Sequence, residues 1–188
     1  MAGKMEASFD IRADLKLRDC TLGDADIIAE IYNTYIRKGG STMDTQLRSR
    51  EDVVQQIEGF HQRETIMMLE RAEDNHVLGW GLIKRNSDLM GFRVSCETSI
   101  YIQADQLGKG YGTYLKKAVL ERCRSMGYHH IVAKIFASNT TSINYNKRLG
   151  YEIVGRQREI GYRDGKWQDV VIMQLILDDV PPFKPELG

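Results

Sequence analysis

The sequence predicts an α+β fold built on a mixed β-sheet, and three observations support this. Runs rich in β-branched and aromatic residues alternate with amphipathic stretches of helix length, in the order β-α-α-β-β-β-α-β-α-β-β. The strand–helix–strand unit within residues 92–137 predicts one parallel pair. Turn-forming connections such as Asp164-Gly165 predict antiparallel hairpins. We therefore expect a mostly antiparallel sheet of about seven strands, flanked by about four helices.

The first half of the chain supplies four expected strands and two expected helices. Residues 13–20 form the first strand, and an amphipathic helix over 21–38 follows, with Thr21 and Asp24 in the spacing of an N-terminal cap. A second helix over 49–62 begins at Ser49. The other three strands are expected over 65–72, 76–85 and 92–103.

The second half begins with a glycine run and a helix of about four turns. The apolar face of this helix holds Leu115, Ala118, Val119, Cys123 and Met126. A strand over 129–137, a short helix over 139–150 and two strands over 151–162 and 166–177 complete the pattern. Because there is no repeat or linker, we expect one domain over 14–179, with a flexible leader over 1–13 and an extended tail over 180–188.

Composition argues against several classes of partner. Lys plus Arg equals Asp plus Glu at 26 each, so no bulk charge favours nucleic acid or a membrane surface. No apolar run approaches the roughly 20 residues that span a bilayer. Three scattered cysteines and four histidines lack the spacing of a metal site, and Cys96 and Cys123 lie on apolar faces that predict packed thiols. We expect a cytoplasmic protein without metal, nucleic acid or membrane.

The glycine run Gly108, Gly110 and Gly112 stands between an expected strand and an expected helix. Free N–H groups and the helix dipole make such a helix start an anion site, and Lys109 and Thr113 add a charge and a hydroxyl. The spacing fits neither the dinucleotide fingerprint nor the P-loop. A tight turn without a ligand is the alternative, but the pattern favours phosphate binding.

This run resembles the coenzyme-A-binding loop of the GNAT (GCN5-related) N-acetyltransferases. The stretch "NTTSINYNKRLGY" resembles the family's Asn-containing helix, and the element order matches over residues 14–177. The pieces "GFRVSCETSIYI" and "GYRDGKWQDV" are similar to the phosphinothricin and methionine-sulfoximine acetyltransferases within that family. At the first loop position Leu107 replaces the family's Arg or Gln, which removes one side-chain contact.

The resemblance implies acetyl-CoA as cofactor and a set of residues that bind it. Asn139 and Ser142 have a second interpretation, because both can satisfy the start of the short helix. The expected cofactor-binding residues are Ser99, Ile100, Tyr101, Ile102, Leu107, Gly108, Lys109, Gly110, Tyr111, Gly112, Thr113, Asn139, Ser142 and Asn146.

Two residues are expected at the reacting groups. Strand alternation places Glu97 on a polar face, where it is either a solvated carboxylate or, as the resemblance implies, the general base for the substrate amine. Asn146 stands where many relatives carry a tyrosine and the phosphinothricin group a histidine to protonate the leaving thiolate. Its amide can donate a hydrogen bond but no proton. Tyr145 is one residue off and is expected to face elsewhere.

The resemblance also implies a substrate site. Arg93 is either the partner of an amino-acid carboxylate or a surface arginine, and Trp167 either completes the site or dimer contact or packs within the hairpin. The expected substrate-binding residues are Ser41, Thr42, Met43, Phe92, Arg93, Trp167 and Asp169.

Together these features predict an acetyl-CoA-dependent N-acetyltransferase for a small amino-acid-like amine, acting as a homodimer. Polyamines, aminoglycosides or a protein N-terminus are alternative acceptors. A non-catalytic acyl-CoA-binding module is the alternative of another class, which the lack of an acid at Asn146 favours and the presence of Glu97 opposes.

Overall fold

The computed structural model describes residues 12–184. The expected leader thus lies almost wholly outside the described residues, as do the last four residues of the expected tail. The strands are β1 (Leu15–Asp19), β2 (Thr65–Arg71), β3 (Val77–Arg85), β4 (Ser95–Ile102), β5 (His130–Phe136), β6 (Glu152–Arg163) and β7 (Lys166–Ile176). The helices are α1 (Ala25–Lys38), α2 (Arg50–Glu58), α3 (Tyr111–Ser125) and α4 (Thr140–Arg148), with short 3-10 turns at Leu22–Asp24, Met90–Phe92 and Ala104–Gln106.

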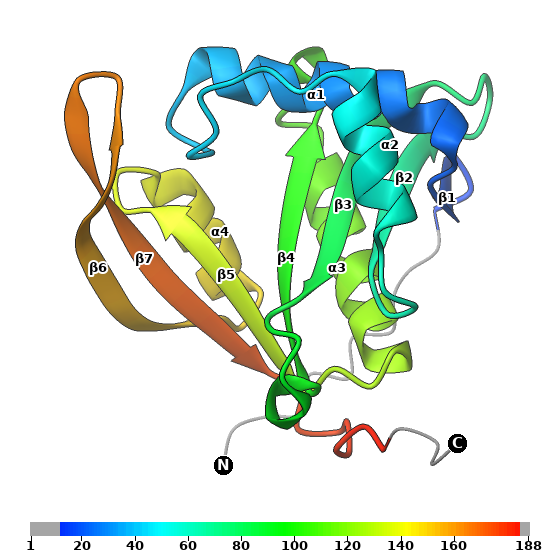
Figure 1. Ribbon diagram of the computed structural model, residues 1–188. Coiled ribbons are helices and arrows are strands. Elements are labelled where there is room, and N and C mark those ends of the chain that lie inside the picture. Colours follow the sequence, from blue (N-terminus) through cyan, green and yellow to red (C-terminus); the bar gives the residue numbers. More distant parts are fainter. Residues whose placement is uncertain (1–11, 185–188) are drawn as a thin grey trace.

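The seven strands form one mixed sheet in the order β1-β2-β3-β4-β5-β7-β6. Every neighbouring pair is antiparallel except β4 and β5, which α3 connects, so the predicted fold class and parallel pair are confirmed. That parallel pairing covers only residues 95–97 of β4 against 130–132 of β5. Beyond it the two strands diverge, and the sheet splits into two arms (Figure 1).

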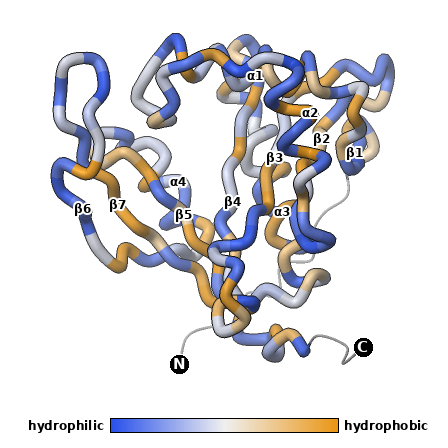
Figure 2. The backbone as a smooth tube through the Cα atoms, viewed as in Figure 1, coloured by the Kyte–Doolittle hydropathy of each residue, from blue (hydrophilic) through white to orange (hydrophobic). Residues whose placement is uncertain are grey.

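Helices cover both faces of the sheet. Helices α1 and α2 lie on one face and α3 and α4 on the other (Figure 1). The strands β2 and β3 are largely hydrophobic, whereas the tip of the β6–β7 hairpin is hydrophilic to neutral (Figure 2). The core under α3 contains the predicted Leu115, Ala118, Val119 and Cys123, packed against the sheet together with Cys96. A second core under α1 and α2 contains Ile28, Ile31, Val53, Ile66, Met68 and Trp80.

The described part of the tail, residues 180–184, has no regular secondary structure and runs along the end of the sheet where β4 begins (Figure 1). The carbonyl oxygen of Val180 lies 2.9 Å from Nδ1 of His129, and the ring of Phe183 stacks 3.8 Å from the guanidinium of Arg63. These contacts tie the tail to the domain.

Candidate active site

The glycine run forms an open, uncapped helix start. Gly108 and Gly110 have φ angles of 80° and 83°, a region that favours glycine, and a Cβ at either position would meet no atom within 4 Å. The first helical hydrogen bond of α3 joins the Tyr114 N–H to the Gly110 carbonyl. Among the described residues no side chain caps α3, whereas Ser49 caps α2 and Asn139 caps α4. The preceding amides, residues 111–113, therefore lack an intrahelical acceptor, as an anion site requires.

Side chains around this loop leave its outer surface accessible. Leu107 is exposed, and the Nζ of Lys109 donates to Oε1 of Gln106 at 3.0 Å. The hydroxyl of Tyr145 donates to the Gly112 carbonyl at 2.9 Å, which fixes α4 against the start of α3. Tyr145 thus faces the glycine run.

The hydrogen bonds of Tyr35 show which backbone groups of β4 face away from β3, toward the gap that opens between β4 and β5. The Tyr35 hydroxyl donates to the Ile102 carbonyl at 2.7 Å and accepts from the Ile102 N–H at 3.0 Å, so these groups point away from β3. Because backbone direction alternates, Ile100 faces the same way, while Ser99 and Tyr101 face β3. Of the four residues expected here, Ile100 alone turns N–H and C=O groups toward β5 without a tyrosine covering them.

Glu97 occupies the last paired position of β4 before the sheet splits. One of its oxygens accepts a 2.7 Å hydrogen bond from Nζ of Lys134 on β5. The carboxylate side chain is 30% exposed and the lysine side chain 50% exposed, so solvent reaches both. Lys84 is the register partner of Glu97 on β3 and lies on the same face, also exposed. Sequence reasoning missed both lysines, because only strand register brings them beside Glu97.

Helix α4 has a buried amide at the position expected to serve the leaving group. Asn146 is buried, its Nδ2 donates to the Ser142 carbonyl at 2.9 Å, and its Oδ1 has no hydrogen-bond partner among the described residues. Asn139 accepts from the Ser142 N–H at 3.0 Å, so the capping interpretation of Asn139 is confirmed. Its Nδ2 also points toward the Gly40 carbonyl at 3.4 Å.

An aromatic cluster lies on the face of the sheet that carries Glu97, at the other end of β4. The Tyr101 ring lies 4.4 Å from Trp80, 5.0 Å from Tyr32 and 5.1 Å from Tyr35, measured between ring centroids. Burial raises the pKa of Tyr35 and of Tyr101, so both phenols stay protonated near neutral pH. Tyr32, Trp80 and Tyr101 line a cavity of about 70 Å³, and the buried Nε1 of Trp80 has no hydrogen-bond partner among the described residues.

The loop after α1, where substrate residues were expected, is tied to the β6–β7 hairpin. The buried Thr42 hydroxyl contacts the Tyr32 hydroxyl at 2.6 Å, and the Thr42 carbonyl accepts from Arg163 at 2.6 Å. The thioether of Met43 packs against Gly161, where a Cβ would lie only 2.8 Å from it. Ser41 is exposed in the same loop.

The other four expected substrate residues lie outside the loop that follows α1. Arg93 donates to the carbonyls of Phe183 and Met90 at 2.8 and 2.9 Å, and Phe92 is exposed beside it; both residues precede the start of β4, whereas the glycine run follows its end. Trp167 is 63% exposed and packs edge-on against Tyr162 in the hairpin, with ring centroids 5.1 Å apart. Asp169 accepts from Arg156 and from the Glu159 N–H. The structure thus does not bring these four residues to Glu97.

Over residues 12–184, none of the helices combines the length and hydropathy needed to cross a membrane. Within the same range, His, Cys, Asp and Glu side chains do not gather in groups of three or more that could hold a metal ion.

Comparison with known proteins assigns the family. Residues 17–172 match the model of the acetyltransferase (GNAT) domain. An L-methionine sulfoximine/L-methionine sulfone acetyltransferase of Pseudomonas aeruginosa is 34% identical over 166 residues, covering 86% of this chain and 94% of that protein. An L-amino acid N-acyltransferase of Escherichia coli is 29% identical, covering 88% and 95%. The crystal structure of a GNAT superfamily phosphinothricin acetyltransferase from Sinorhizobium meliloti, in complex with AcCoA, superposes with a TM-score of 0.83 at 26% identity, covering 93% and 95%.

The split sheet, the uncapped glycine helix start and these matches define the class of protein. The chain belongs to the GNAT acetyltransferase family. It is an N-acetyltransferase.

Proposed function

We propose that this protein transfers the acetyl group of acetyl-CoA to the primary amine of a small amino-acid-like substrate of the methionine sulfoximine or phosphinothricin type. The observation that carries the proposal is the carboxylate of Glu97, partly exposed where β4 and β5 separate. The 34% identity to a methionine sulfoximine/sulfone acetyltransferase over nearly its whole length supports this choice of substrate class.

The residues around the glycine run fit acetyl-CoA, which supplies the activated thioester. The free amides of residues 111–113, at the positive end of the α3 dipole, suit a pyrophosphate group. Gly108 and Gly110 leave open space above the loop, so a phosphate can approach the backbone. The backbone of Ile100 offers strand-like hydrogen bonds to an extended amide chain lying between β4 and β5.

Glu97 is the proposed general base. An ammonium group cannot attack a thioester until it loses a proton, and a carboxylate that is reachable by substrate and partly shielded from water can accept that proton directly or through one water. The Ile100 N–H faces the same opening and is suited to donate to the acyl oxygen as negative charge develops there. The reaction needs no enzyme nucleophile, which agrees with the complete burial of Cys96 and Cys123.

The leaving thiolate has no evident acid among the residues expected to serve it. Asn146 cannot release a proton, and one of its two side-chain N–H groups already donates to the Ser142 carbonyl. The Tyr145 hydroxyl donates to Gly112, and burial raises the pKa of Tyr145. A thiol with a pKa of about 8.5 leaves adequately as thiolate, so we propose departure without a dedicated acid.

The test is a free-thiol release assay with acetyl-CoA against methionine sulfoximine, methionine sulfone, phosphinothricin, spermidine and an aminoglycoside. We expect the amino-acid-like amines to be acetylated and Glu97→Gln to lower turnover at least 100-fold. Acetyl-CoA affinity, measured by calorimetry, should change less than twofold, and Glu152→Gln on the exposed surface of β6 serves as control. Unchanged turnover in Glu97→Gln would remove it as the base. Acetyl-CoA binding without thiol release for any amine would favour the non-catalytic module.

We further propose a homodimer in the cytoplasm. Several apolar side chains on β6 and at the β6–β7 turn are exposed, as is common at protein–protein interfaces. The thiols of Cys96 and Cys123 lie 3.7 Å apart, at hydrogen-bond distance for sulfur, and form no disulfide with each other, which suits a reducing compartment. The apolar residues that support the dimer are Ile153, Val154, Ile160, Tyr162 and Trp167.

A further inference from the structure

We propose that Lys134 recognises the α-carboxylate of the substrate while its partner Glu97 receives the α-amine. This inference rests on the proposed function and deepens it. It names the group that would select an α-amino acid over other amines. The observation behind it is the 2.7 Å ion pair between Nζ of Lys134 and the Glu97 carboxylate, at the point where β4 and β5 separate.

The geometry places a positive and a negative group side by side on one accessible face. Val132 is the register partner of Glu97 on β5, and Lys134 lies two residues further along that strand, so the three side chains share a face. The lysine therefore reaches back toward Glu97 from the side on which the strands have already diverged. An α-amino acid carries its ammonium and carboxylate groups on one carbon, so its positive and negative charges are also adjacent.

A zwitterion can replace this ion pair without leaving either protein charge uncompensated. The pair is half exposed, and such pairs contribute little to stability, so opening it has a small cost. The substrate ammonium would then face Glu97 and its carboxylate would face Lys134. The flexible four-carbon stem of lysine allows the small movement that this exchange requires.

The charge around Glu97 also discriminates between acceptor classes. Lys84 is the register partner of Glu97 on β3, and Lys134 pairs with its carboxylate from β5, so two lysines neighbour one glutamate on this face. This excess positive charge attracts a substrate with a carboxylate and repels polyamines and aminoglycosides. Arg93, the carboxylate partner expected from the sequence, donates instead to the carbonyls of Phe183 and Met90.

The experiment compares L-methionine sulfone with its carboxamide, which keeps the amine but lacks the negative charge. Thiol release is measured for the wild-type protein, Lys134→Gln, Lys134→Arg and the control Lys117→Gln, an exposed lysine on α3. We expect Lys134→Gln to raise KM for the acid at least tenfold, because a charge-assisted hydrogen bond is lost, and to change KM for the amide less than threefold. Lys134→Arg should retain most of the preference for the acid, and Lys117→Gln all of it.

Several outcomes would overturn the proposal. An equal loss for acid and amide in Lys134→Gln would mean that the lysine acts on Glu97 alone. Unchanged kinetics would mean that Lys134 contributes to neither binding nor turnover. A gain in kcat for both substrates would mean that Lys134 only blocks the Glu97 carboxylate. Either result leaves the proposed function standing, because the wild-type protein still acetylates the amino acid. A wild-type protein that acetylates only polyamines or aminoglycosides would overturn the proposed function and this inference together.

Discussion

Lys116 is a lysine on α3 whose ammonium group lies enclosed between the helix and the sheet. It is almost fully buried, its Nζ donates to Oγ1 of Thr98 at 2.6 Å, and the Tyr151 ring lies 5.0 Å away. Burial lowers the pKa of Lys116 from 10.5 to about 8. The charged form is thus destabilised relative to the unfolded chain, and within residues 12–184 no carboxylate is bonded to it to offset that cost.

We expect Lys116→Met to stabilise the protein at pH 7 by about 2 kcal/mol. The pKa difference corresponds to about 3 kcal/mol, from which the loss of the Thr98 hydrogen bond subtracts about 1 kcal/mol. Because the folded-state pKa is lowered, the unfolded chain binds more protons between pH 8 and 10.5, and wild-type stability gains from this group as pH rises through that window. The stability advantage of Lys116→Met over the wild-type protein should therefore shrink as the pH rises from 8 to 10.5.

Urea unfolding of the wild-type protein and the variant at pH 7, 9 and 10 measures this. Groups distant from Lys116 that titrate in the same window are common to both proteins, so their contributions cancel in the difference. A constant difference across the three pH values would contradict the account and indicate an effect of packing alone.

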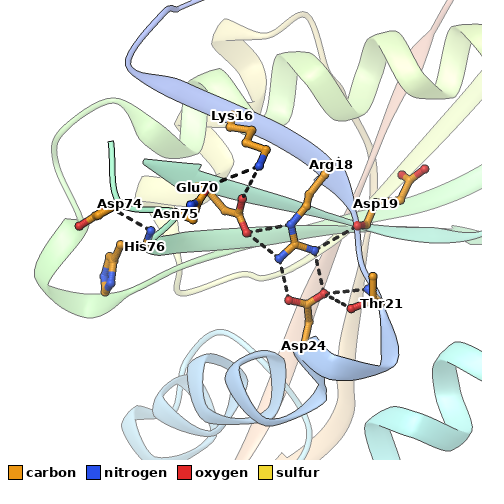
Figure 3. Close-up of polar contacts among 9 residues, drawn as sticks. All are labelled: Lys16, Arg18, Asp19, Thr21, Asp24, Glu70, Asp74, Asn75 and His76. Carbon is orange, nitrogen blue, oxygen red and sulfur yellow. Dashed lines mark hydrogen bonds and ion pairs between the residues drawn. The ribbon is translucent and has the colours of Figure 1, made fainter. Parts of the chain in front are cut away.

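The connection from β1 into α1 contains a network of charged side chains. Arg18 on β1 donates to both oxygens of Asp24 at 2.7 Å and to Glu70 on β2 at 2.8 Å (Figure 3). Asp24 also accepts from the N–H and hydroxyl of Thr21, at 2.7 and 2.9 Å, as the predicted capping spacing requires. One carboxylate therefore orients the helix start and joins it to the sheet.

We expect Asp24→Asn to destabilise the protein by about 2 kcal/mol at pH 7. Hydrogen bonds from Arg18, and then from Thr21, lower the pKa of Asp24 from 3.8 to about 2. A lowered carboxyl pKa stabilises the fold above the unfolded value, and this contribution is lost as pH falls from about 4 to 2. Urea unfolding should thus show the two proteins converging toward pH 2. Asp26→Asn, an exposed carboxylate paired with Arg50, is the control and should change stability by less than 1 kcal/mol. A deficit in Asp24→Asn that persists at pH 2 would contradict the electrostatic account.

At the scale of elements, much of the fold was predictable, because its signals are local. Period-two and helical patterns predicted the strands and helices. The Thr21 and Ser49 caps indicated where two helical segments begin, and the glycine run indicated the start of α3. The contacts around Glu97 were not predictable, since Lys134 lies 37 residues away and only parallel register brings it near. Arg93 is held by the Phe183 carbonyl, 90 residues on, so its location depends on where the tail runs. Lys116 adjoins the predicted apolar stripe, and no sequence signal marks it as buried.

At the scale of the whole molecule, the split in the sheet creates two arms whose relative position must be fixed by other contacts. One arm carries β1 to β4 with α1 and α2, and the other carries β5, β7 and β6 (Figure 1). Arg163, buried at the end of β6, bridges them: its guanidinium donates to the carbonyls of Ile36, Thr42 and Asp44. It thereby links the end of α1 and the loop after it to the hairpin, opposite the short β4–β5 pairing.

We expect Arg163→Met to loosen the loop that follows α1 and to leave the glycine run unchanged. Three carbonyls lose their donor, and methionine fills the apolar volume of the side chain without replacing any of the hydrogen bonds. Trypsin should then cleave after Arg48 several times faster than in the wild-type protein, a result that does not depend on the proposed function. If the loop contributes to the amine site, KM for L-methionine sulfone should rise roughly tenfold or more, because small displacements of positioning groups are costly. Acetyl-CoA affinity by calorimetry should stay within twofold, since α3 is not part of the bridge.

Arg156→Gln, an exposed arginine on the same strand that pairs with Asp169, is the matched control and should change neither cleavage nor KM. Unchanged cleavage in Arg163→Met, or an equal loss of acetyl-CoA and amine binding, would show that Arg163 supports the fold in general rather than holding the two arms together at this loop.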